Sequence, residues 1–480
     1  MNKNMELITL ILEQVQMSTL AKDDKLVSDA LLLYPAEEIA SRYELEKLLP
    51  NFCIQSFFFN NFKFSDNEGN KFCADSARSP IEHIEALWPY LHRRSDTSEL
   101  STKISLPYPY VVPGGRFREI YYWDSYFTQL GLMASGRFDW IEHQLDNFSY
   151  LIEKFGHVPN GNRTYFLSRS QPPFFAHMVD SFANGIPSRR SEIFEKYLPS
   201  LLNEYSYWTM PNRSFGSLSH YRDDLDVPRT EMYRTDMEWK IPASRRPQFY
   251  RHMRAACESG WDFSSRWLAD SYNLSSIRTL DIIPVDLNSL LLFYETMLSE
   301  LTGDNRFLNA ASRRKDEIQS LLFARESGFH DYDYKNGKLI TEIHSAAALF
   351  PLFVHAATDD QARVVAAQVK SHLLREGGIT ATNIRSGQQW DSPNGWAPLH
   401  WVAVCGLRNY GYDDLAESIA RRWINTCEKT YYKLGKFVEK YNVESDSEGA
   451  SNGEYKTQDG FGWTNGVYLA LKSLYPTAPT

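Results

Sequence analysis

The sequence predicts an all-α protein in which helical hairpins form a closed ring, an (α/α)6 toroid with long loops and a small β-hairpin. Roughly a dozen segments space their apolar residues every three or four positions, as amphipathic helices do, and these segments follow one another in pairs. Polar loops rich in aromatic residues come after alternate members of the pairs. In a toroid such loops line one deep pocket. A plain helical bundle or a solenoid is the competing fold, although long polar loops are unusual in either.

The chain divides into an extension and one large domain. A length of 480 residues favours two to four domains of ordinary size, yet no Pro-, Gly- or Ser-rich tract, low-complexity run or long charge block marks a linker. We therefore expect an N-terminal helical extension over residues 1–78 and an (α/α)6 domain over residues 79–480. The extension carries the cluster Phe57-Phe58-Phe59, which we expect to pack on the large domain, and it suggests no chemistry.

The first half of the large domain alternates paired helices with polar loops. Apolar residues from Ile81 to Leu91 follow helical spacing. Three prolines and the pair Gly114-Gly115 then predict a loop, and helical spacing resumes near Glu119. The remaining helices of this half are predicted over residues 119–133, 137–155, 174–182 and 192–208.

Capping residues and turn residues define the second half. Pro284 can open a helix, and Asp304 can cap the next one. Thr358 and Gln361 have the spacing of a capping box, while the pair at residues 336–337, Asn-Gly, predicts the turn of a β-hairpin. The hairpin is expected over residues 328–340, and the helices are expected over residues 284–301, 304–323, 343–357, 361–373, 414–429 and 464–474, with one more from residue 398.

Charge and cysteine content restrict the partners and the compartment. A net charge of −9 and a pI of about 5.8 argue against nucleic-acid binding, which needs clustered Lys and Arg. Nowhere do 18 apolar residues run together, and the apolar run over residues 7–12 is short for a signal peptide. The cysteines are odd in number and scattered, which favours a reducing compartment. We expect a soluble cytoplasmic monomer without a membrane or nucleic-acid partner.

Composition and motifs favour a carbohydrate ligand. Aromatic residues make up 14% of the chain, and aromatic faces stack on sugar rings, although large helical domains also use aromatics as core filler. No GxxxxGK[ST], HExxH or GxSxG pattern is present. The polar loops instead offer Asp, Glu, Arg, Asn and Gln side chains. These suit a polyhydroxylated ligand and leave carboxyl groups for acid–base catalysis.

The segment ESGWDFSSRW, residues 258–267, places Asp262 between two large aromatic residues. Burial among aromatic rings raises the pKa of a carboxyl group because the charged form loses water, and a protonated carboxyl can act as a general acid. The alternative is that Asp262 caps a helix and its tryptophan neighbour packs in the core. Asp124 and Asp391 also follow a tryptophan, so the residues alone do not select one of the three.

Four stretches of the chain resemble the trehalase family of inverting glycoside hydrolases. PGGRFREIYYWDSYF at residues 113–127 and QWDSPNGWAPLHW at residues 389–401 are close to the family's signatures, and SGWDFSSRW and DGFGWTNGV are similar to other family segments. The similarity extends over about residues 79–475. It implies a bacterial-type cytoplasmic member with an (α/α)6 barrel, which hydrolyses α,α-trehalose to two glucose molecules without a cofactor.

The resemblance also implies roles for individual residues. The general acid falls on Asp262, and the general base, which activates water, falls on Glu439. Family members usually carry a glycine run before position 454, whereas residues 448–453 here are EGASNG, so we expect this lid loop to close differently. The expected substrate-binding residues are Arg116, Phe117, Trp123, Asp124, Asn160, Arg169, Gln171, Arg229, Glu231, Gly260, Trp390, Glu454, Phe461 and Trp463.

Two further kinds of function remain open at this point. Another disaccharide hydrolase or a sugar epimerase can use the same barrel, but an epimerase would use histidines as acid–base groups where these loops carry carboxylates. A catalytically silent sugar-binding protein is the third hypothesis, and the presence of both carboxyl groups argues against it. For Cys257 and His400 we expect structural roles.

Overall fold

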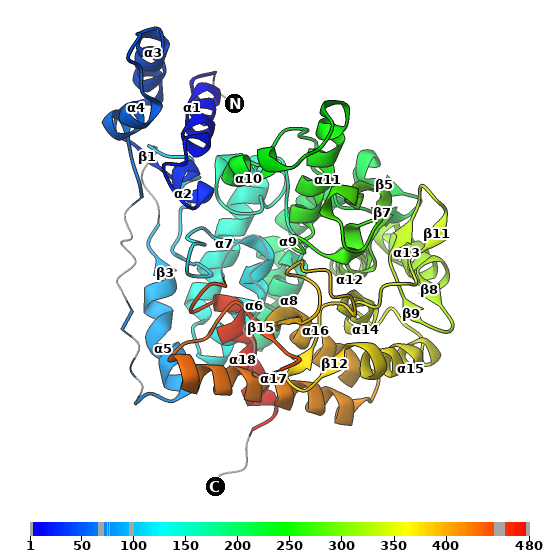
Figure 1. Cartoon of the computed structure of the whole chain (residues 1–480). Helices are drawn as coiled ribbons and strands as arrows, with labels where there is room; N and C mark the ends of the chain where they lie inside the picture. The colour runs from blue at the N-terminus through cyan, green and yellow to red at the C-terminus, as the bar shows by residue number, and fades with distance from the viewer. Residues whose placement is uncertain are drawn as a thin grey trace.

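Paired helices surround a buried centre, as the sequence predicts (Figure 1). The computed structural model describes residues 3–65, 72–73, 75, 77–95, 100–445 and 457–476. Helices adjacent in this part of the chain pack together: α6 (Tyr122–Ala134) on α7 (Phe138–Phe155), α8 (Phe175–Gly185) on α9 (Arg190–Trp208), α12 (Val285–Thr302) on α13 (Asn305–Leu321), and α16 (Ala397–Arg408) on α17 (Asp413–Leu434). The all-α toroid is confirmed.

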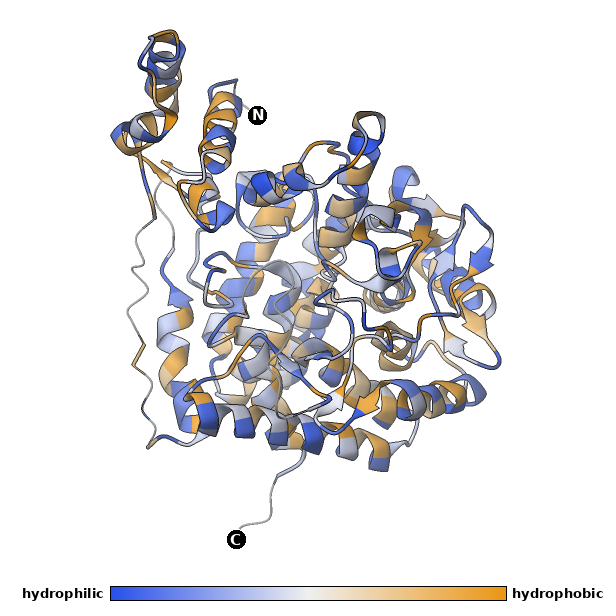
Figure 2. Cartoon of the chain, in the orientation of Figure 1, coloured by the Kyte–Doolittle hydropathy of each residue, from blue (hydrophilic) through white to orange (hydrophobic). Residues whose placement is uncertain are grey.

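Burial separates the inner helices of the ring from the outer ones. The side chains of α6 and α12 are buried nearly all round, because neighbouring elements cover them on every side. The side chains of α7 and α17 are buried on one face only, in keeping with their amphipathic spacing. Figure 2 shows α17 with hydrophilic and hydrophobic residues alternating along its length. The main apolar core therefore lies between two layers of helices.

The last helix closes the ring on the first inner helix. α18 (Gly462–Leu474) packs along α6, and two glycines make the close approach possible. A Cβ atom on Gly466 would lie 2.0 Å from the carbonyl oxygen of Phe127, and one on Gly131 would lie 2.5 Å from the Cα of Gly466. The two helices lie backbone to backbone at these glycines, and no larger side chain fits there. This contact joins the two ends of the large domain.

Short antiparallel strands pair within and between the loops. The expected hairpin is confirmed, since β10 (Tyr332–Asp333) pairs with β11 (Lys338–Leu339), and β7 (Ile282–Ile283) adds a third strand. β14 (Asn394–Trp396) pairs with β15 (Lys440–Asn442) and so brings two distant loops together. The other strands are β1 (Leu31–Leu32), β2 (Phe62–Lys63), β3 (His92–Arg93), β4 (Tyr110–Val111), β5 (Ser214–Phe215), β6 (Leu218–Ser219), β8 (Phe323–Ala324), β9 (Gly328–Phe329), β12 (Leu374–Arg375) and β13 (Gly378–Ile379).

The two expected helix caps are confirmed. The side chain of Asp304 accepts a hydrogen bond from the backbone of α13, and Thr358 with Gln361 forms the capping box of α15 (Asp359–Gln368). The expected helix over residues 343–357 is wrong: only the short helix α14 (Phe350–Phe353) forms there, after a 3₁₀ turn, and Pro351 in its first turn has no N–H group to donate. The remaining helices of the large domain are α5 (Pro80–Leu91), α10 (Tyr233–Glu238) and α11 (Arg246–Glu258).

The N-terminal helices form a small unit with an apolar cluster of their own. It consists of α1 (Lys3–Met17), α2 (Asp24–Ser28), α3 (Ala36–Glu46) and α4 (Ile54–Asn61). Phe57 and Phe58 pack in this cluster and Phe59 is exposed, so the expectation that they pack on the large domain is wrong. They pack there with Tyr43, Phe52 and Phe62, so the extension buries its own aromatic residues. α1 and α2 contact the large domain at and beside α10 (Figure 1). The expected boundary at residue 78 stays a prediction.

Candidate active site

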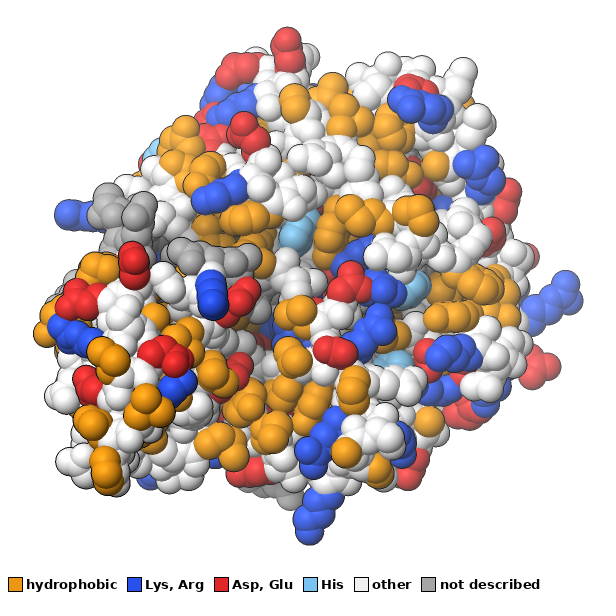
Figure 3. Space-filling model, turned by 90° about the horizontal axis from the view of Figure 1, so that it is seen from above, with side chains coloured by type: hydrophobic (Ala, Val, Ile, Leu, Met, Phe, Trp, Pro, Cys, Tyr) orange, Lys and Arg blue, Asp and Glu red, His pale blue; other side chains and the backbone are white. Residues whose placement is uncertain are grey.

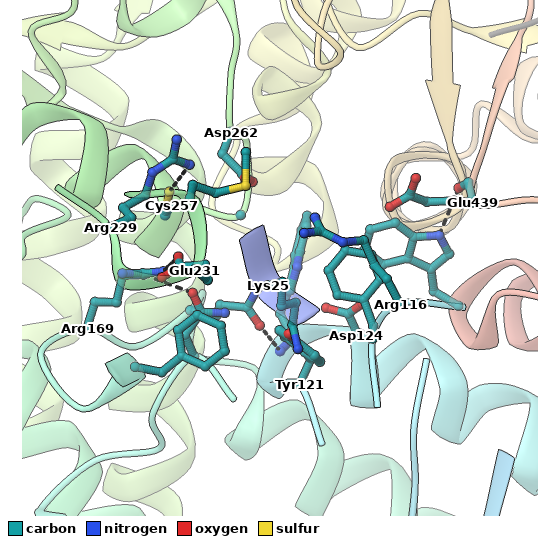
Figure 4. A pocket seen from close by; sticks show the side chains of 18 of the residues that line it. Lys25, Arg116, Tyr121, Asp124, Arg169, Arg229, Glu231, Cys257, Asp262 and Glu439 are labelled. Carbon is teal, nitrogen blue, oxygen red and sulfur yellow. Dashed lines mark hydrogen bonds and ion pairs between the residues drawn. The ribbon is translucent and has the colours of Figure 1, made fainter. Parts of the chain in front are cut away.

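Loops from distant parts of the chain meet around one pocket with about 710 Å³ of empty space. Ligand sites commonly occupy about 300–1,000 Å³. The loop before α6, the loops after α7 and α11, and the segments before β14, β15 and α18 all reach the pocket (Figure 4). Its lining residues are Lys25, Arg116, Phe117, Tyr121, Trp123, Asp124, Asn160, Phe166, Arg169, Gln171, Arg229, Glu231, Met232, Cys257, Gly260, Asp262, Trp390, Trp396, Glu439, Phe461 and Trp463.

The pocket brings together the expected site residues that the structure describes. Glu454 lies outside the described residues, so its expected place in a lid has no structural description. The contacts of these residues with a sugar stay a prediction. The lining residues that were not among the expected site residues are Lys25, Tyr121, Phe166, Met232, Cys257 and Trp396. Tyr121 and Trp396 lie inside the family-like stretches, which is a signal that could have identified them, whereas Lys25 lies in the N-terminal extension and carries no such signal.

Asp262 and Glu439 reach the pocket from different elements (Figure 4). Asp262 follows α11, and Glu439 immediately precedes β15. The side chain of Gln389 connects the two segments: its amide nitrogen donates to the carbonyl oxygen of Asp262, and its amide oxygen accepts a hydrogen bond from Lys440 Nζ at 2.8 Å. Lys440 Nζ also lies 3.4 Å from the carboxylate of Glu439. Gln389 thereby connects the backbone at Asp262 to the lysine that follows Glu439.

Asp124 supplies a third carboxyl group, from the first turn of α6. Burial raises the pKa of Asp124 well above its usual value, and the nearby charges of Glu439 and Asp262 raise it further. Burial and neighbouring carboxyl groups thus favour the protonated form of Asp124. Asp124 therefore offers a hydroxyl donor to a ligand as well as an acceptor.

Tryptophan rings form one wall of the pocket. Trp390 stacks on Trp396 with ring centroids 3.8 Å apart and on Trp261 with centroids 5.2 Å apart. Trp123 packs against Trp390 on one side and against the edge of Trp463 on the other. Rings held in this way present rigid apolar faces, which suit the apolar faces of sugar rings.

Two arginines and a glutamate form a polar wall. Arg169 Nη2 donates to Glu231 Oε1 at 2.6 Å, and Arg229 Nη2 donates to Asp236 Oδ1 at 2.6 Å. Both arginines are buried. Arg169 Nη1 and Glu231 Oε2 have no hydrogen-bond partner among the described residues, although each is buried. Buried polar atoms are normally satisfied, so this pair of atoms is suited to the hydroxyl groups of a ligand.

Gly260 allows the backbone that carries Asp262 to approach the tryptophan wall. Its φ angle is +73°, which side-chain-bearing residues rarely adopt. A Cβ atom at this position would lie 2.7 Å from a ring carbon of Trp123. The glycine is therefore required both by its conformation and by the close contact.

Asp391 and His400 have structural roles. Asp391 lies behind the pocket and accepts hydrogen bonds from Ser265 N and Thr382 Oγ1 at 2.8 Å and 2.7 Å. His400 is buried and accepts a hydrogen bond from Ile379 N at 2.9 Å, as expected of a core residue. The sulfur of Cys257 accepts a hydrogen bond from Arg229 at 3.4 Å and lines the pocket, so its expected structural role stays a prediction.

The described residues lack features typical of metal-binding, membrane-spanning and nucleic-acid-binding proteins. No group of His, Cys, Asp and Glu side chains there is arranged to hold a metal ion. None of the described helices combines the length and the apolar composition that crossing a bilayer requires. Figure 3 shows acidic and basic side chains interspersed over the face seen from above, which differs from the clustered positive charge of nucleic-acid-binding proteins.

The chain is similar over nearly its whole length to proteins named periplasmic trehalase. It is 43% identical to the one from Citrobacter koseri over 97% of this chain and 85% of that protein. It is 44% identical to the one from Xanthomonas axonopodis pv. citri over 98% of this chain and 86% of that protein. Among solved structures, the neutral trehalase Nth1 from Saccharomyces cerevisiae matches with a TM-score of 0.67 and 25% identity, over 85% of this chain and 81% of that one.

These relatives contradict the expected cytoplasmic location, because their names place them in the periplasm. The expectation rested partly on cysteines that are odd in number and scattered. All five are free in the structure, but a domain of this size buries enough apolar surface to be stable without disulfides in either compartment. Free cysteines therefore do not identify the compartment.

The family model described as Trehalase matches residues 62–476. That range contains the whole ring of helices and every loop of the pocket except the contribution of Lys25. With the extended identity to named trehalases, the match shows that this chain belongs to the trehalase family.

Proposed function

We propose that this protein hydrolyses α,α-trehalose to two glucose molecules with inversion, with Asp262 as the general acid and Glu439 as the general base. The observation that carries the proposal is the convergence of both carboxyl groups on one pocket of a trehalase-family toroid. They reach it from different elements, and inversion requires room between them for a water molecule and the glycosidic bond. The names of the relatives support a periplasmic location.

Each carboxyl group moves one proton. Asp262 donates its proton to the glycosidic oxygen while the bond from that oxygen to the anomeric carbon breaks. Water attacks the same carbon from the opposite face, and Glu439 accepts the proton that the water loses. One glucose leaves with its original configuration, and the other carries the new hydroxyl group with inverted configuration. Exchange of protons with solvent then restores both carboxyl groups.

The two walls of the pocket hold the sugar for this reaction. The tryptophan wall offers ring faces, and Arg169 with Glu231 offers buried polar atoms that have no hydrogen-bond partner among the described residues. A sugar hydroxyl can donate to one of these atoms and accept from the other. Such hydrogen bonds orient the disaccharide, so that its glycosidic oxygen lies beside Asp262.

The proposal is tested by glucose release from a panel of glucosyl disaccharides. Trehalose should be cleaved far faster than maltose, cellobiose and sucrose. Proton NMR during the first turnovers should show one β-glucose for each α-glucose released, because one anomeric centre inverts. Only α-glucose at early times would contradict inversion, and no glucose from trehalose would contradict the function itself.

A further inference from the structure

Part of the N-terminal unit reaches the pocket, although the match to the family model begins at residue 62. Lys25, in α2, lines the pocket, and Figure 4 shows it among the side chains of the site. Lys25 Nζ lies 2.9 Å from Glu119 Oε2 and 2.5 Å from Asp29 Oδ2. Burial raises the pKa of Glu119, but the ion pairs with Lys25 and Arg163 outweigh burial and lower it below the usual range. A buried charged network therefore joins α2 to the loop before α6.

Asp23 caps α2 and holds Arg116 at the same time. Its Oδ1 accepts a hydrogen bond from Lys25 N at 3.0 Å. The same carboxylate accepts hydrogen bonds from Arg116 Nη2 at 2.6 Å and Arg116 Nε at 3.0 Å. A two-point contact of this kind fixes the plane of a guanidinium group as well as its position. Asp23 therefore restricts the orientation of the Arg116 side chain, which lines the pocket.

The N-terminal unit also holds a second loop of the pocket. Gln16 Nε2 and Ser28 Oγ each donate a hydrogen bond to the carbonyl oxygen of Thr230 at 2.8 Å. Thr230 lies between Arg229 and Glu231, both of which line the pocket. Hydrogen bonds thus connect the N-terminal unit both to the loop that carries Arg116 and to the loop that carries Arg229 and Glu231.

We propose that the N-terminal unit completes the substrate-binding site and that Asp23 is a positioning residue, which orients Arg116 toward the sugar. This inference rests on the proposed function, in which Arg116 contacts trehalose. Asp23 pairs with Arg116 and lies outside the pocket lining. Its loss should therefore weaken substrate binding and leave the chemical step nearly unchanged.

The test is Asp23→Ser. Serine also caps helices, but it is neutral and too short to bind the guanidinium at two points. Because Arg116 would lose its fixed orientation, KM for trehalose should rise by about tenfold while kcat stays within about threefold. The melting temperature should change little, which separates this result from general destabilisation.

Asp304→Ser is a matched control. Asp304 caps α13, and its carboxylate pairs with Arg306 Nε at 2.8 Å and Nη2 at 2.7 Å, outside the pocket lining. Both variants thus remove an aspartate that caps a helix and pairs with an arginine. Asp304→Ser should leave KM and kcat at their wild-type values. An equal rise in KM in both variants would overturn the role of Asp23.

A double-mutant cycle shows whether Asp23 acts through Arg116. Adding Asp23→Ser to Arg116→Ala should not raise KM further, because the residue that Asp23 orients is already absent. Independent effects of the two changes would overturn the positioning role. Calorimetric titration of trehalose into Asp262→Asn, with and without Asp23→Ser, measures the same effect as a rise in Kd without turnover. An inactive wild type would refute the proposed function, whereas an unchanged KM or Kd in Asp23→Ser would refute this inference.

Discussion

The Trp-Asp pairs at residues 123–124 and 390–391 are alike in sequence and burial but differ in their surroundings. The side chains of Asp124 and Asp391 are both buried. Burial raises the pKa of both carboxyl groups, well above the usual value in Asp124 and to about 6 in Asp391. Asp391 lies outside the pocket lining and is surrounded by hydrogen-bond donors. These donors come from Ser264, Ser265, Thr382 and Ser386.

The two neighbourhoods lead to different functions for the same dipeptide. Hydroxyl and amide donors around Asp391 stabilise its ionised form and connect it to the segment just after Asp262. Asp124 instead lines the pocket and lies close enough to Asp262 and Glu439 for their charges to raise its pKa. Asp391 therefore belongs to the scaffold of the site, while Asp124 is placed to meet a ligand.

The largest expected effect belongs to Asp262, the aspartate of the third Trp-Asp pair. Asp262→Asn keeps the shape of the side chain but removes the proton that a general acid transfers, so kcat for trehalose should fall by about 10²–10⁴-fold. Steady-state glucose release measures this loss. Unchanged trehalose binding by calorimetry and an unchanged melting temperature are the controls. Wild-type turnover by the folded variant would remove Asp262 from the role of acid.

Helical spacing, proline positions and capping residues predict most of the paired helices, because these signals depend on residues that are close in the chain. They do not by themselves exclude a bundle or a solenoid. The loops of the pocket were recognised through long family-like stretches. The difference between Asp124 and Asp391 was not predictable from the residues, since it depends on donors such as Ser265, 126 positions away. The pair between Asp23 and Arg116, 93 positions apart, has no local signal for the same reason.

Asp391→Ala should have the largest effect on stability. It removes the common acceptor of several buried donors, and each unsatisfied buried donor costs about 1–3 kcal/mol, so we expect a loss of about 3–5 kcal/mol. Urea unfolding followed by circular dichroism measures it. The activity that remains in the folded fraction should exceed that of Asp262→Asn. A fully stable Asp391→Ala protein without activity would instead make Asp391 a catalytic residue.

The pH dependence of the free energy of unfolding tests the raised pKa of Asp391. Burial raises its pKa from 3.8 to about 6, so between those values the folded state binds more protons than the unfolded state. The contribution of Asp391 to the free energy of unfolding is therefore fully present below about pH 4 and is lost as pH rises through about 6. Asp391→Asn does not titrate, so the stability of wild type relative to this variant should fall by about 2–3 kcal/mol from pH 4 to pH 7. Parallel pH profiles of the two proteins would contradict the raised pKa.

The smallest expected effect is that of Asp124→Asn. If Asp124 keeps its proton in the pocket, asparagine reproduces its shape, its acceptor and a donor, so kcat/KM for trehalose should fall by less than about tenfold. Asp124→Ala removes both donor and acceptor, and sugar hydroxyls left unpaired in a buried site should lower kcat/KM by about 10–100-fold. The ratio of kcat/KM between these two variants is the informative quantity. It distinguishes a side chain that only hydrogen-bonds a sugar hydroxyl from one that must be ionised or must transfer a proton. An Asp124→Asn protein as inactive as Asp262→Asn would show that the charge or the proton of Asp124 takes part in the reaction.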